Sequence, residues 1–262
     1  MKIGIIGLGE IGSAVFKAIA KNCSRENLFG IDIDDGKFQE LKLLGYNVGT
    51  SFPGLMDVYI ITVWTTEQVM TVVRGLDMSN NPLVVIESTV DMETCNKLRV
   101  ELKDKEFDLV AFPHRYNGGD FEHQIFNLKR VMGGITEVGL MRGRNFFLNF
   151  MDPKLIYLVN DIRSAEACKV IENAYRYVEI ALAQELRMSL ESKGLDWKEV
   201  IAACNTKWNI NILEPRGGIG KHCLPKDIKL FNVLFSSNTL FNWAENSNND
   251  YIKYLEGVNG KK

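Results

Sequence analysis

The sequence predicts an α/β protein in which a doubly wound parallel sheet is followed by an all-helical domain with one long helix. In the first half, short apolar runs rich in β-branched residues alternate with stretches of helical periodicity. This alternation is typical of a parallel sheet covered by helices on both faces. In the second half, residues 164–192 contain neither glycine nor proline, which allows a helix of about 40 Å. We therefore expect a sheet domain over residues 1–160 and a helical domain over residues 161–262.

Six apolar runs mark the expected strands. They are residues 2–6, 28–33, 58–63, 83–86, 109–112 and 131–134. Residues 11–20 have the spacing of a first covering helix. After the long helix, Gly194 is expected to end it and Asp196 to cap a second helix. A glycine-rich loop, residues 215–221, then precedes another helix that begins near Asp227.

Composition and charge exclude several classes of protein. The chain has 262 residues, 46% of them apolar, and a formal charge of −2. This balance gives no electrostatic reason to expect nucleic acid or an anionic membrane as a partner. No apolar run approaches the roughly 20 residues of a membrane span. The five cysteines and three histidines are scattered, so we expect no disulfide scaffold, no metal site and a reducing cytoplasmic location.

The first apolar run is followed by a glycine fingerprint, Gly7-Leu8-Gly9-Glu10-Ile11-Gly12. In this strand-to-helix context, Gly7 allows the tight turn, Gly9 lets a pyrophosphate approach the backbone, and Gly12 lets the helix pack closely on the strand. The free N–H groups of the first helical turn, at Glu10 and Ile11, then face the phosphates. The sheet domain is therefore expected to be a Rossmann domain that binds a dinucleotide.

The second apolar run ends in two acidic residues, Asp32 and Asp34. A carboxylate at this place accepts hydrogen bonds from the adenine ribose hydroxyls and repels a 2′-phosphate. Asp32 is the better placed of the two, which favours NAD over NADP. The alternative is that both acids only cap a turn and that the glycines serve packing alone.

Cys223 follows the glycine-rich loop and lies among Lys221, His222 and Lys226. Neighbouring cations lower the pKa of a thiol and raise its thiolate fraction. Such a thiolate can attack an aldehyde or an activated carbonyl. A structural role for this cysteine is the alternative from local context.

Taken together, these segments resemble the UDP-glucose/GDP-mannose dehydrogenase family of nucleotide-sugar 6-dehydrogenases. The matching segments are GLGEIGSA, Asp32, the Glu87-Ser88-Thr89-Val90 segment, AEACKVIENAYRYVEIALAQEL and GIGKHCLPKD. The resemblance implies oxidation of a sugar C6 alcohol to a carboxylate with two NAD. It also implies that a cysteine forms a thiohemiacetal, which a second hydride transfer turns into a thioester that water hydrolyses.

The resemblance implies a role for several residues of the second half. Cys223 matches the nucleophile. Lys169 and Asn173 match the lysine and asparagine that hold the reacting oxygen, and their spacing of four puts them on one helix face. Asp227 matches the aspartate that orients the lysine and water. Lys226 matches a residue at the cofactor phosphates. For Lys169 and Asn173, the alternative is that they belong to an ordinary helix face exposed to solvent.

In the first half, the resemblance concerns the loops beside the cofactor. Thr89 matches a threonine that binds water near the nicotinamide. Trp64 and Thr65 fall in a segment that borders the cofactor, where Trp64 replaces a proline and is either a stacking residue or a core residue. His114 stands where the family has a glutamate that acts as general base. Histidine accepts protons near neutral pH, so it either replaces that base, leaves hydrolysis impaired, or is a loop residue without a catalytic task.

The chain also departs from the family at its end. The family's third domain, which binds the nucleotide half of the substrate, would follow the Ser247-Asn248-Asn249 segment, and only residues 250–262 follow here. We therefore expect a smaller sugar-like substrate, a partner chain that supplies the nucleotide-binding domain, or loss of activity.

Three functions follow from these observations. The first is an NAD-dependent dehydrogenase that uses Cys223 to oxidise a sugar-like alcohol by two or four electrons. The second is a two-electron dehydrogenase of the β-hydroxyacid type, and the third is a non-catalytic NAD-binding subunit of a split enzyme. The long helix carries an apolar stripe that predicts a homodimer. Its residues are Ile171, Ala174, Val178, Ala181 and Leu182, with Tyr175 and Leu186 near it.

Overall fold

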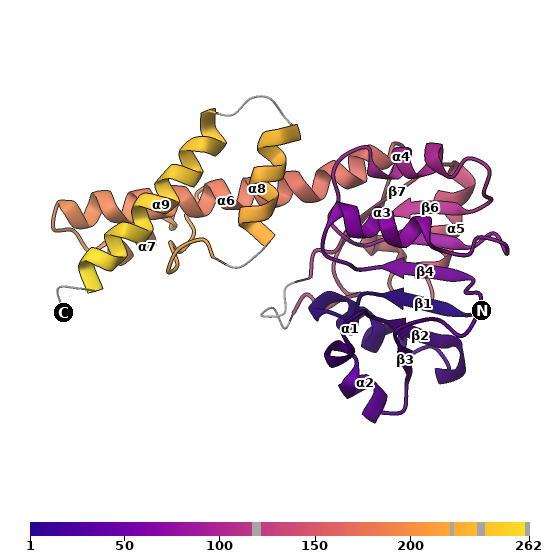
Figure 1. Ribbon diagram of the computed structural model, residues 1–262. Helices are drawn as coiled ribbons and strands as arrows, with labels where there is room; N and C mark the ends of the chain where they lie inside the picture. The colour runs from indigo at the N-terminus through magenta and orange to yellow at the C-terminus, as the bar shows by residue number, and fades with distance from the viewer. Residues whose placement is uncertain (117–121, 221–222, 235–238, 260–262) are drawn as a thin grey trace. The chain divides into compact units, whose positions relative to one another are not determined.

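The computed structural model describes residues 1–116, 122–220, 223–234 and 239–259. The chain forms two compact units, Met1–Lys169 and Val170–Lys262. The division falls inside the long helix α6 (Ile162–Ser192), so that one helix contributes residues to both units. Figure 1 shows the strands in the first unit and helices alone in the second.

The first unit contains a sheet of eight strands in the order β3-β2-β1-β4-β5-β6-β7-β8. Their bounds are β1 Ile3–Ile6, β2 Leu28–Ile31, β3 Asn47–Gly49, β4 Val58–Ile61, β5 Leu83–Ile86, β6 Asp108–Ala111, β7 Arg130–Gly134 and β8 Ile156–Val159. All pairs are parallel except that of β6 with β7. The reversal of strand order at β1 makes a topological switch point between β1 and β4, where ligands bind in such sheets.

Helices cover both faces of this sheet. One face packs against α1 (Glu10–Ile19), α2 (Gln39–Leu43) and α5 (Glu137–Phe147). The other face packs against α3 (Thr66–Arg74), α4 (Thr94–Glu101) and the first turns of α6. Short 3₁₀ turns at Arg25–Asn27, Asp35–Lys37 and Pro153–Leu155 complete the connections. Because both faces are covered, β1, β4 and β5 are buried along their whole length, as their continuous apolar runs predicted.

The second unit consists of the rest of α6 with α7 (Trp197–Cys204), α8 (Cys223–Leu234) and α9 (Thr239–Asn259). Its core joins Tyr177 and Ile180 of α6 to Ile228 of α8 and Ala244 of α9. None of the helices described is long and apolar enough to cross a membrane. Within the same residues, no cluster of three histidine, cysteine or acidic side chains could hold a metal ion.

The expected α/β class and Rossmann sheet are confirmed, but the sequence missed both edge strands. Strand β3 has three residues, and β8 exposes Tyr157 while pairing with β7 on one side only. Strand β3 has the sequence NVG, which is too short and too polar to stand out as an apolar run. Strand β8, by contrast, is the apolar run IYLV, which is as long as β5 and was overlooked. The long helix begins at Ile162, two residues before the predicted stretch, and α8 begins at Cys223, four residues earlier than expected.

Gly194 ends α6 as predicted, because it adopts a left-handed φ of 73°. Its N–H donates to the carbonyl of Glu191, and the N–H of Leu195 donates to that of Leu190. Asp196 then caps α7 by accepting a hydrogen bond from the Lys198 N–H.

We expect Gly194→Ala to lower the free energy of unfolding by about 1 kcal/mol, since an L-residue is strained at positive φ. Gly257→Ala is the matched control. A Cβ meets no neighbour at either glycine, but Gly257 lies inside α9 without positive φ, so alanine should stabilise the helix there. Thermal unfolding followed by circular dichroism measures both. If both variants changed the free energy of unfolding by the same amount, the positive φ of Gly194 would not explain how α6 ends.

Candidate active site

The glycine fingerprint forms the turn from β1 into α1 at the carboxyl edge of the sheet. Gly7 has a φ of 89°, and a Cβ on Gly12 would lie 1.8 Å from the carbonyl oxygen of Gly7. A Cβ on Gly9, by contrast, would meet no atom within 4 Å. No side chain caps α1 at Gly9, which leaves the N-terminal end of the helix available to an anion. The loop therefore has the open cradle that a pyrophosphate requires.

Asp32 and the loop are joined directly. The Asp32 Oδ2 atom accepts a hydrogen bond of 2.6 Å from the Leu8 N–H, and Oδ1 accepts one of 2.9 Å from the Asp34 N–H. Each carboxylate oxygen has a second lone pair, so Asp32 retains the capacity to accept from ribose hydroxyls. Asp34 instead caps the short helix Asp35–Lys37 by accepting from the Gly36 N–H.

Strand β4 supports the glycine loop from the other side through Thr62, a residue that sequence reasoning missed. The Thr62 hydroxyl contacts the carbonyl oxygens of Ile6 and Gly7 at 3.0 and 2.7 Å. A threonine at the end of an apolar run carries no signal for this role, since its partner lies on another strand. Thr65 forms a capping box with Gln68 at the start of α3, and Trp64 beside it is 49% exposed. Trp64 is therefore not a core residue of the first unit.

The next loops bring Thr89 and His114 to the same edge of the sheet. Thr89 follows β5 and is half-buried, whereas His114 follows β6 and is only 6% exposed. The Nε2 atom of His114 lies 2.6 Å from Oε2 of Glu87, and the other carboxylate oxygen lies 2.9 Å from the guanidinium of Arg130. Glu87 and Arg130 are buried and charged, and sequence reasoning gave neither of them a chemical role.

Three groups set the protonation state of His114. Burial, Arg130 and Lys169 lower its pKa and outweigh the opposite effect of Glu87. The imidazole is therefore neutral near pH 7 and able to accept a proton. Burial by itself would raise the pKa of Glu87, but Arg130 and His114 outweigh it and hold that pKa below its ordinary value.

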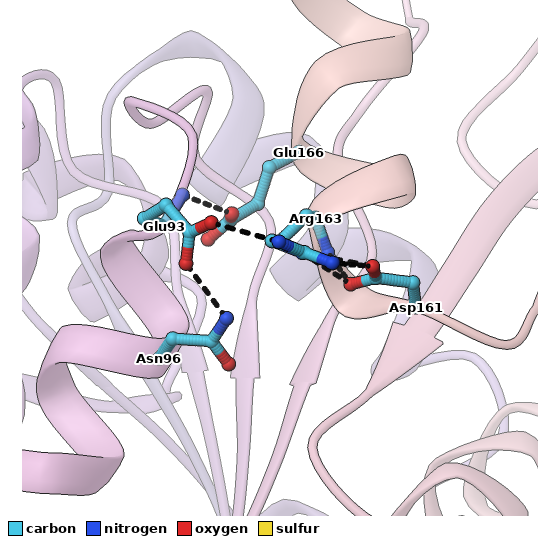
Figure 2. Close-up of polar contacts among 5 residues, drawn as sticks. All are labelled: Glu93, Asn96, Asp161, Arg163 and Glu166. Carbon is cyan, nitrogen blue, oxygen red and sulfur yellow. Dashed lines mark hydrogen bonds and ion pairs between the residues drawn. The ribbon is translucent and has the colours of Figure 1, made fainter.

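The start of α6 is fixed on the first unit by the carboxylate of Glu166 (Figure 2). It accepts hydrogen bonds of 2.8 Å from the N–H groups of Glu93 and Cys95 at the beginning of α4. Arg163 adds ion pairs with Asp161 and Glu93. These contacts cap one helix with a side chain of the other, and Glu166 is buried between them.

Lys169 follows Glu166 on α6 by one turn, so the same contacts determine where its ammonium group lies in the first unit. Its charge contributes to lowering the pKa of His114. Cys95 is no competitor to Cys223 as a nucleophile, because burial and the adjacent Glu166 raise the pKa of its thiol well above the ordinary value.

In the second unit, Asn173 and Asp227 are brought together. The Asn173 side-chain amide donates to Asp227 Oδ2 at 2.5 Å, and the Asp227 carboxylate is buried. Lys226 lies 3.6 Å from the other carboxylate oxygen. Cys223 is the first residue of α8, one turn before Asp227. Its side chain lies outside the described residues.

The loop that leads to α8 is held by two helices through residues that were not foreseen as site residues. Asn248 of α9 accepts hydrogen bonds from the Ile219 N–H at 2.7 Å and from Gln184 of α6 at 3.2 Å. Gln184 also donates to the carbonyl of Pro215. The Ser247-Asn248-Asn249 segment was the available signal, since an amide in an apolar helix face must find polar partners.

The first unit has a fold of the Rossmann type, with the glycine loop and Asp32 at its switch point. The second unit carries the helical pairing of Asn173 with Asp227. Residues 163–250 match the central domain of the UDP-glucose/GDP-mannose dehydrogenase family. The match confirms the resemblance over these residues, which are about a third of the chain.

The chain is also similar to individual proteins over a longer stretch. The chain is 29% identical over 260 residues to a UDP-N-acetyl-D-mannosamine dehydrogenase of Methanocaldococcus jannaschii, covering 86% of this chain and 60% of that protein. A solved UDP-D-ManNAc dehydrogenase from Pyrococcus horikoshii superposes with a TM-score of 0.86 at 25% identity, covering all of this chain and 71% of that one. The chain thus spans about 60% of the length of the Methanocaldococcus relative.

A shorter enzyme shares the fold over almost its whole length. The 3-hydroxyisobutyrate dehydrogenase of Mycobacterium tuberculosis superposes with a TM-score of 0.74 at 16% identity. The match covers 97% of this chain and 94% of that one. At this identity the likeness concerns the fold alone.

Two glycine variants separate packing from ligand binding. We expect Gly9→Ala to leave the free energy of unfolding within about 0.5 kcal/mol, since its Cβ enters open space. Affinity for NAD should nevertheless fall at least about tenfold, because the methyl group occupies the approach of the pyrophosphate. Gly12→Ala should destabilise the protein itself, since its Cβ collides with the backbone of Gly7. Calorimetric titration with NAD and thermal unfolding measure the two effects, and unchanged affinity in Gly9→Ala would refute the proposed cradle.

Proposed function

We propose that the chain is an NAD-dependent dehydrogenase that oxidises an alcohol group of a nucleotide sugar or a related sugar-like substrate. One observation carries the proposal: helix α6 bears Lys169, whose charge acts on His114, and Asn173, which donates a hydrogen bond to Asp227. The family match and the names of the relatives support the same substrate class.

The glycine loop and Asp32 fit NAD, since the loop is open where a pyrophosphate lies and Asp32 would repel a 2′-phosphate. When bound, NAD accepts the hydride from the substrate carbon. Lys169 and Asn173 hold the reacting oxygen, and the lysine ammonium stabilises the alkoxide that develops when the hydroxyl loses its proton. The Asp227 carboxylate accepts a hydrogen bond from the Asn173 side-chain amide and so fixes the orientation of that amide.

Cys223 determines how far the oxidation goes. Its thiolate adds to the aldehyde carbon and gives a thiohemiacetal, whose oxygen is again held by Lys169 and Asn173. Loss of a second hydride leaves a thioester on Cys223. His114 then removes a proton from water, and Thr89 holds the water that attacks the thioester carbonyl. The products are a carboxylic acid and the free thiol.

The second candidate is a two-electron oxidation of a hydroxyacid. The spacing of Lys169 and Asn173, four residues apart on one helix, suits this reaction as well, and the cysteine in the GIGKHCLPKD segment opposes it. The number of hydrides per substrate molecule separates the two candidates.

In a screen of alcohols that includes UDP-N-acetyl-D-mannosamine, we expect two NADH per molecule oxidised and an acid as product. Cys223→Ser should stop at one NADH or lose the acid product, since the thioester is no longer formed. Cys204→Ser is the matched control, because Cys204 is an exposed cysteine of the same unit. Absorbance at the NADH band counts the hydrides transferred per molecule, and mass spectrometry shows whether the product is an acid. An acid product at full rate from Cys223→Ser would overturn the role of the cysteine.

We also propose that α6 forms a homodimer contact. Only part of the predicted stripe is exposed and could contact a second copy. Ala174 and Ala181 are buried inside the second unit. The exposed fractions of Ile171, Tyr175 and Leu182 are 45%, 64% and 46%. Their spacings of four and seven place these three side chains on one helix face. Burial of these exposed apolar side chains against a second copy would remove them from water and stabilise a dimer.

Leu182→Glu should raise the dimer dissociation constant at least about tenfold, because an interface would have to bury the new carboxylate. Leu240→Glu is the control, since Leu240 is similarly exposed on α9 of the same unit. Sedimentation velocity over a concentration series measures both. A monomer at micromolar concentration before any substitution would contradict the dimer.

A further inference from the structure

The glycine loop begins where three adjacent parallel strands end. Strand β1 lies between β2 and β4, and its last residue, Ile6, is paired with the last residue of each neighbour. The residues that follow the three strands therefore lie side by side, with Gly7 between Asp32 of β2 and Thr62 of β4. Hydrogen bonds from the Gly7 N–H towards β2 and from the Thr62 N–H towards β1 continue the same register. A turn, a carboxylate and a hydroxyl thus meet at the switch point of the sheet.

The peptide group between Gly7 and Leu8 is held at both of its polar atoms. Its carbonyl oxygen lies 2.7 Å from the Thr62 hydroxyl, and its N–H donates to Asp32 Oδ2 at 2.6 Å. The hydroxyl also lies 3.0 Å from the Ile6 carbonyl oxygen, but that oxygen already accepts from the Thr62 N–H at 2.8 Å. Gly7 and Leu8 are buried, and a buried peptide group needs a partner for each polar atom. Side chains from two neighbouring strands supply both partners.

The next peptide group, between Leu8 and Gly9, is held at its carbonyl oxygen. The Ser13 hydroxyl donates to the Leu8 carbonyl at 2.6 Å. Because a trans peptide directs its C=O and N–H to opposite sides, this contact turns the Gly9 N–H away from Ser13. Among the described residues, no protein group accepts from the Gly9 N–H, and a Cβ on Gly9 would meet no atom within 4 Å. This N–H is therefore available to an anion in the open part of the loop.

The third glycine of the fingerprint leaves space for the Thr62 hydroxyl. A Cβ on Gly12 would lie 1.8 Å from the Gly7 carbonyl oxygen and 2.6 Å from the hydroxyl oxygen of Thr62. A side chain at this position would therefore separate the hydroxyl from the carbonyl. Thr62 thus belongs to the same structural unit as the fingerprint, although it follows Gly7 by 55 residues.

We infer that Thr62 is a positioning residue of the cofactor site. Together with Asp32, it fixes the Gly7–Leu8 peptide group, so that N–H groups and not carbonyl oxygens face the pyrophosphate of a bound dinucleotide. A carbonyl oxygen carries a partial negative charge and repels phosphate, whereas N–H groups attract it. The inference rests on the proposed function for the identity of the ligand, but not for the way in which the peptide group is fixed.

Amide hydrogen exchange of Leu8, measured by NMR, tests the fixed peptide group without any ligand. Thr62→Val keeps the shape of the side chain and removes the hydroxyl. We expect the Leu8 N–H to exchange at least about tenfold faster in this variant, because the peptide group has lost one of its two partners and leaves Asp32 more often. Exchange at the original rate would overturn the inference.

Calorimetric titration with NAD and with ADP-ribose tests the role in binding. We expect Thr62→Val to weaken the binding of both ligands about tenfold, because both carry the pyrophosphate. Thr62→Ser keeps the hydroxyl and should bind both within about threefold of the unmodified protein. A loss of affinity for NAD alone would place the effect at the nicotinamide and overturn the inference. Equal losses in the two variants would overturn it as well, since only one of them lacks the hydroxyl.

Thr136→Val is the matched control. Thr136 caps α5 by accepting a hydrogen bond from the Gly139 N–H, and it follows β7 at the edge of the sheet opposite to the glycine loop, since β7 is antiparallel to β6. This variant should destabilise the protein through the lost cap and leave the affinity for both ligands unchanged. A loss of affinity equal to that of Thr62→Val would show a general structural effect and overturn the inference.

Thr62→Ala covers the case in which Thr62→Val does not fold, because it differs from Thr62→Ser by the hydroxyl alone. If the unmodified protein binds neither NAD nor ADP-ribose, the role in binding fails together with the proposed function. The exchange rate of the Leu8 N–H then still decides whether Thr62 fixes the peptide group.

Discussion

Parallel strand pairing is the constraint on which the candidate site depends. Six neighbouring strands run in the same direction, so the loops that follow them emerge at one edge of the sheet. The glycine loop, Asp32 and His114 come from three of these loops. The antiparallel β7 adds Arg130 to the same edge from its opposite end. Residues more than one hundred positions apart in the chain thereby belong to one surface.

Helix α6 carries catalytic candidates of both units. In the first unit, Glu166 accepts hydrogen bonds from the start of α4 and so anchors the first turns of the helix on the sheet. Lys169 lies one turn further on, at the end of that unit. In the second unit, Asn173 of the same helix is paired with Asp227 of α8.

Much of the fold and part of the site could be predicted from local sequence. The glycine fingerprint, the acidic end of β2 and the glycine-free stretch of α6 each have a local physical cause. Edge strand β3 could not be predicted, because it has one apolar residue and is defined by its pairing with β2. Strand β8 is an apolar run that was overlooked. Thr62 and Asn248 were missed for a reason similar to that of β3, since the backbone groups that they contact lie far away in sequence.

The sequence by itself determined the class of fold, the dinucleotide loop and the identity of the candidate nucleophile. Those features depend on backbone freedom, on periodicity and on residue type, which are local properties. Only the tertiary structure decided that Glu87 and Arg130 enclose His114. It also decided that Ala174 and Ala181 face the core while Leu182 does not. Burial and charge pairing depend on which segments meet in space, and a single segment does not contain that information.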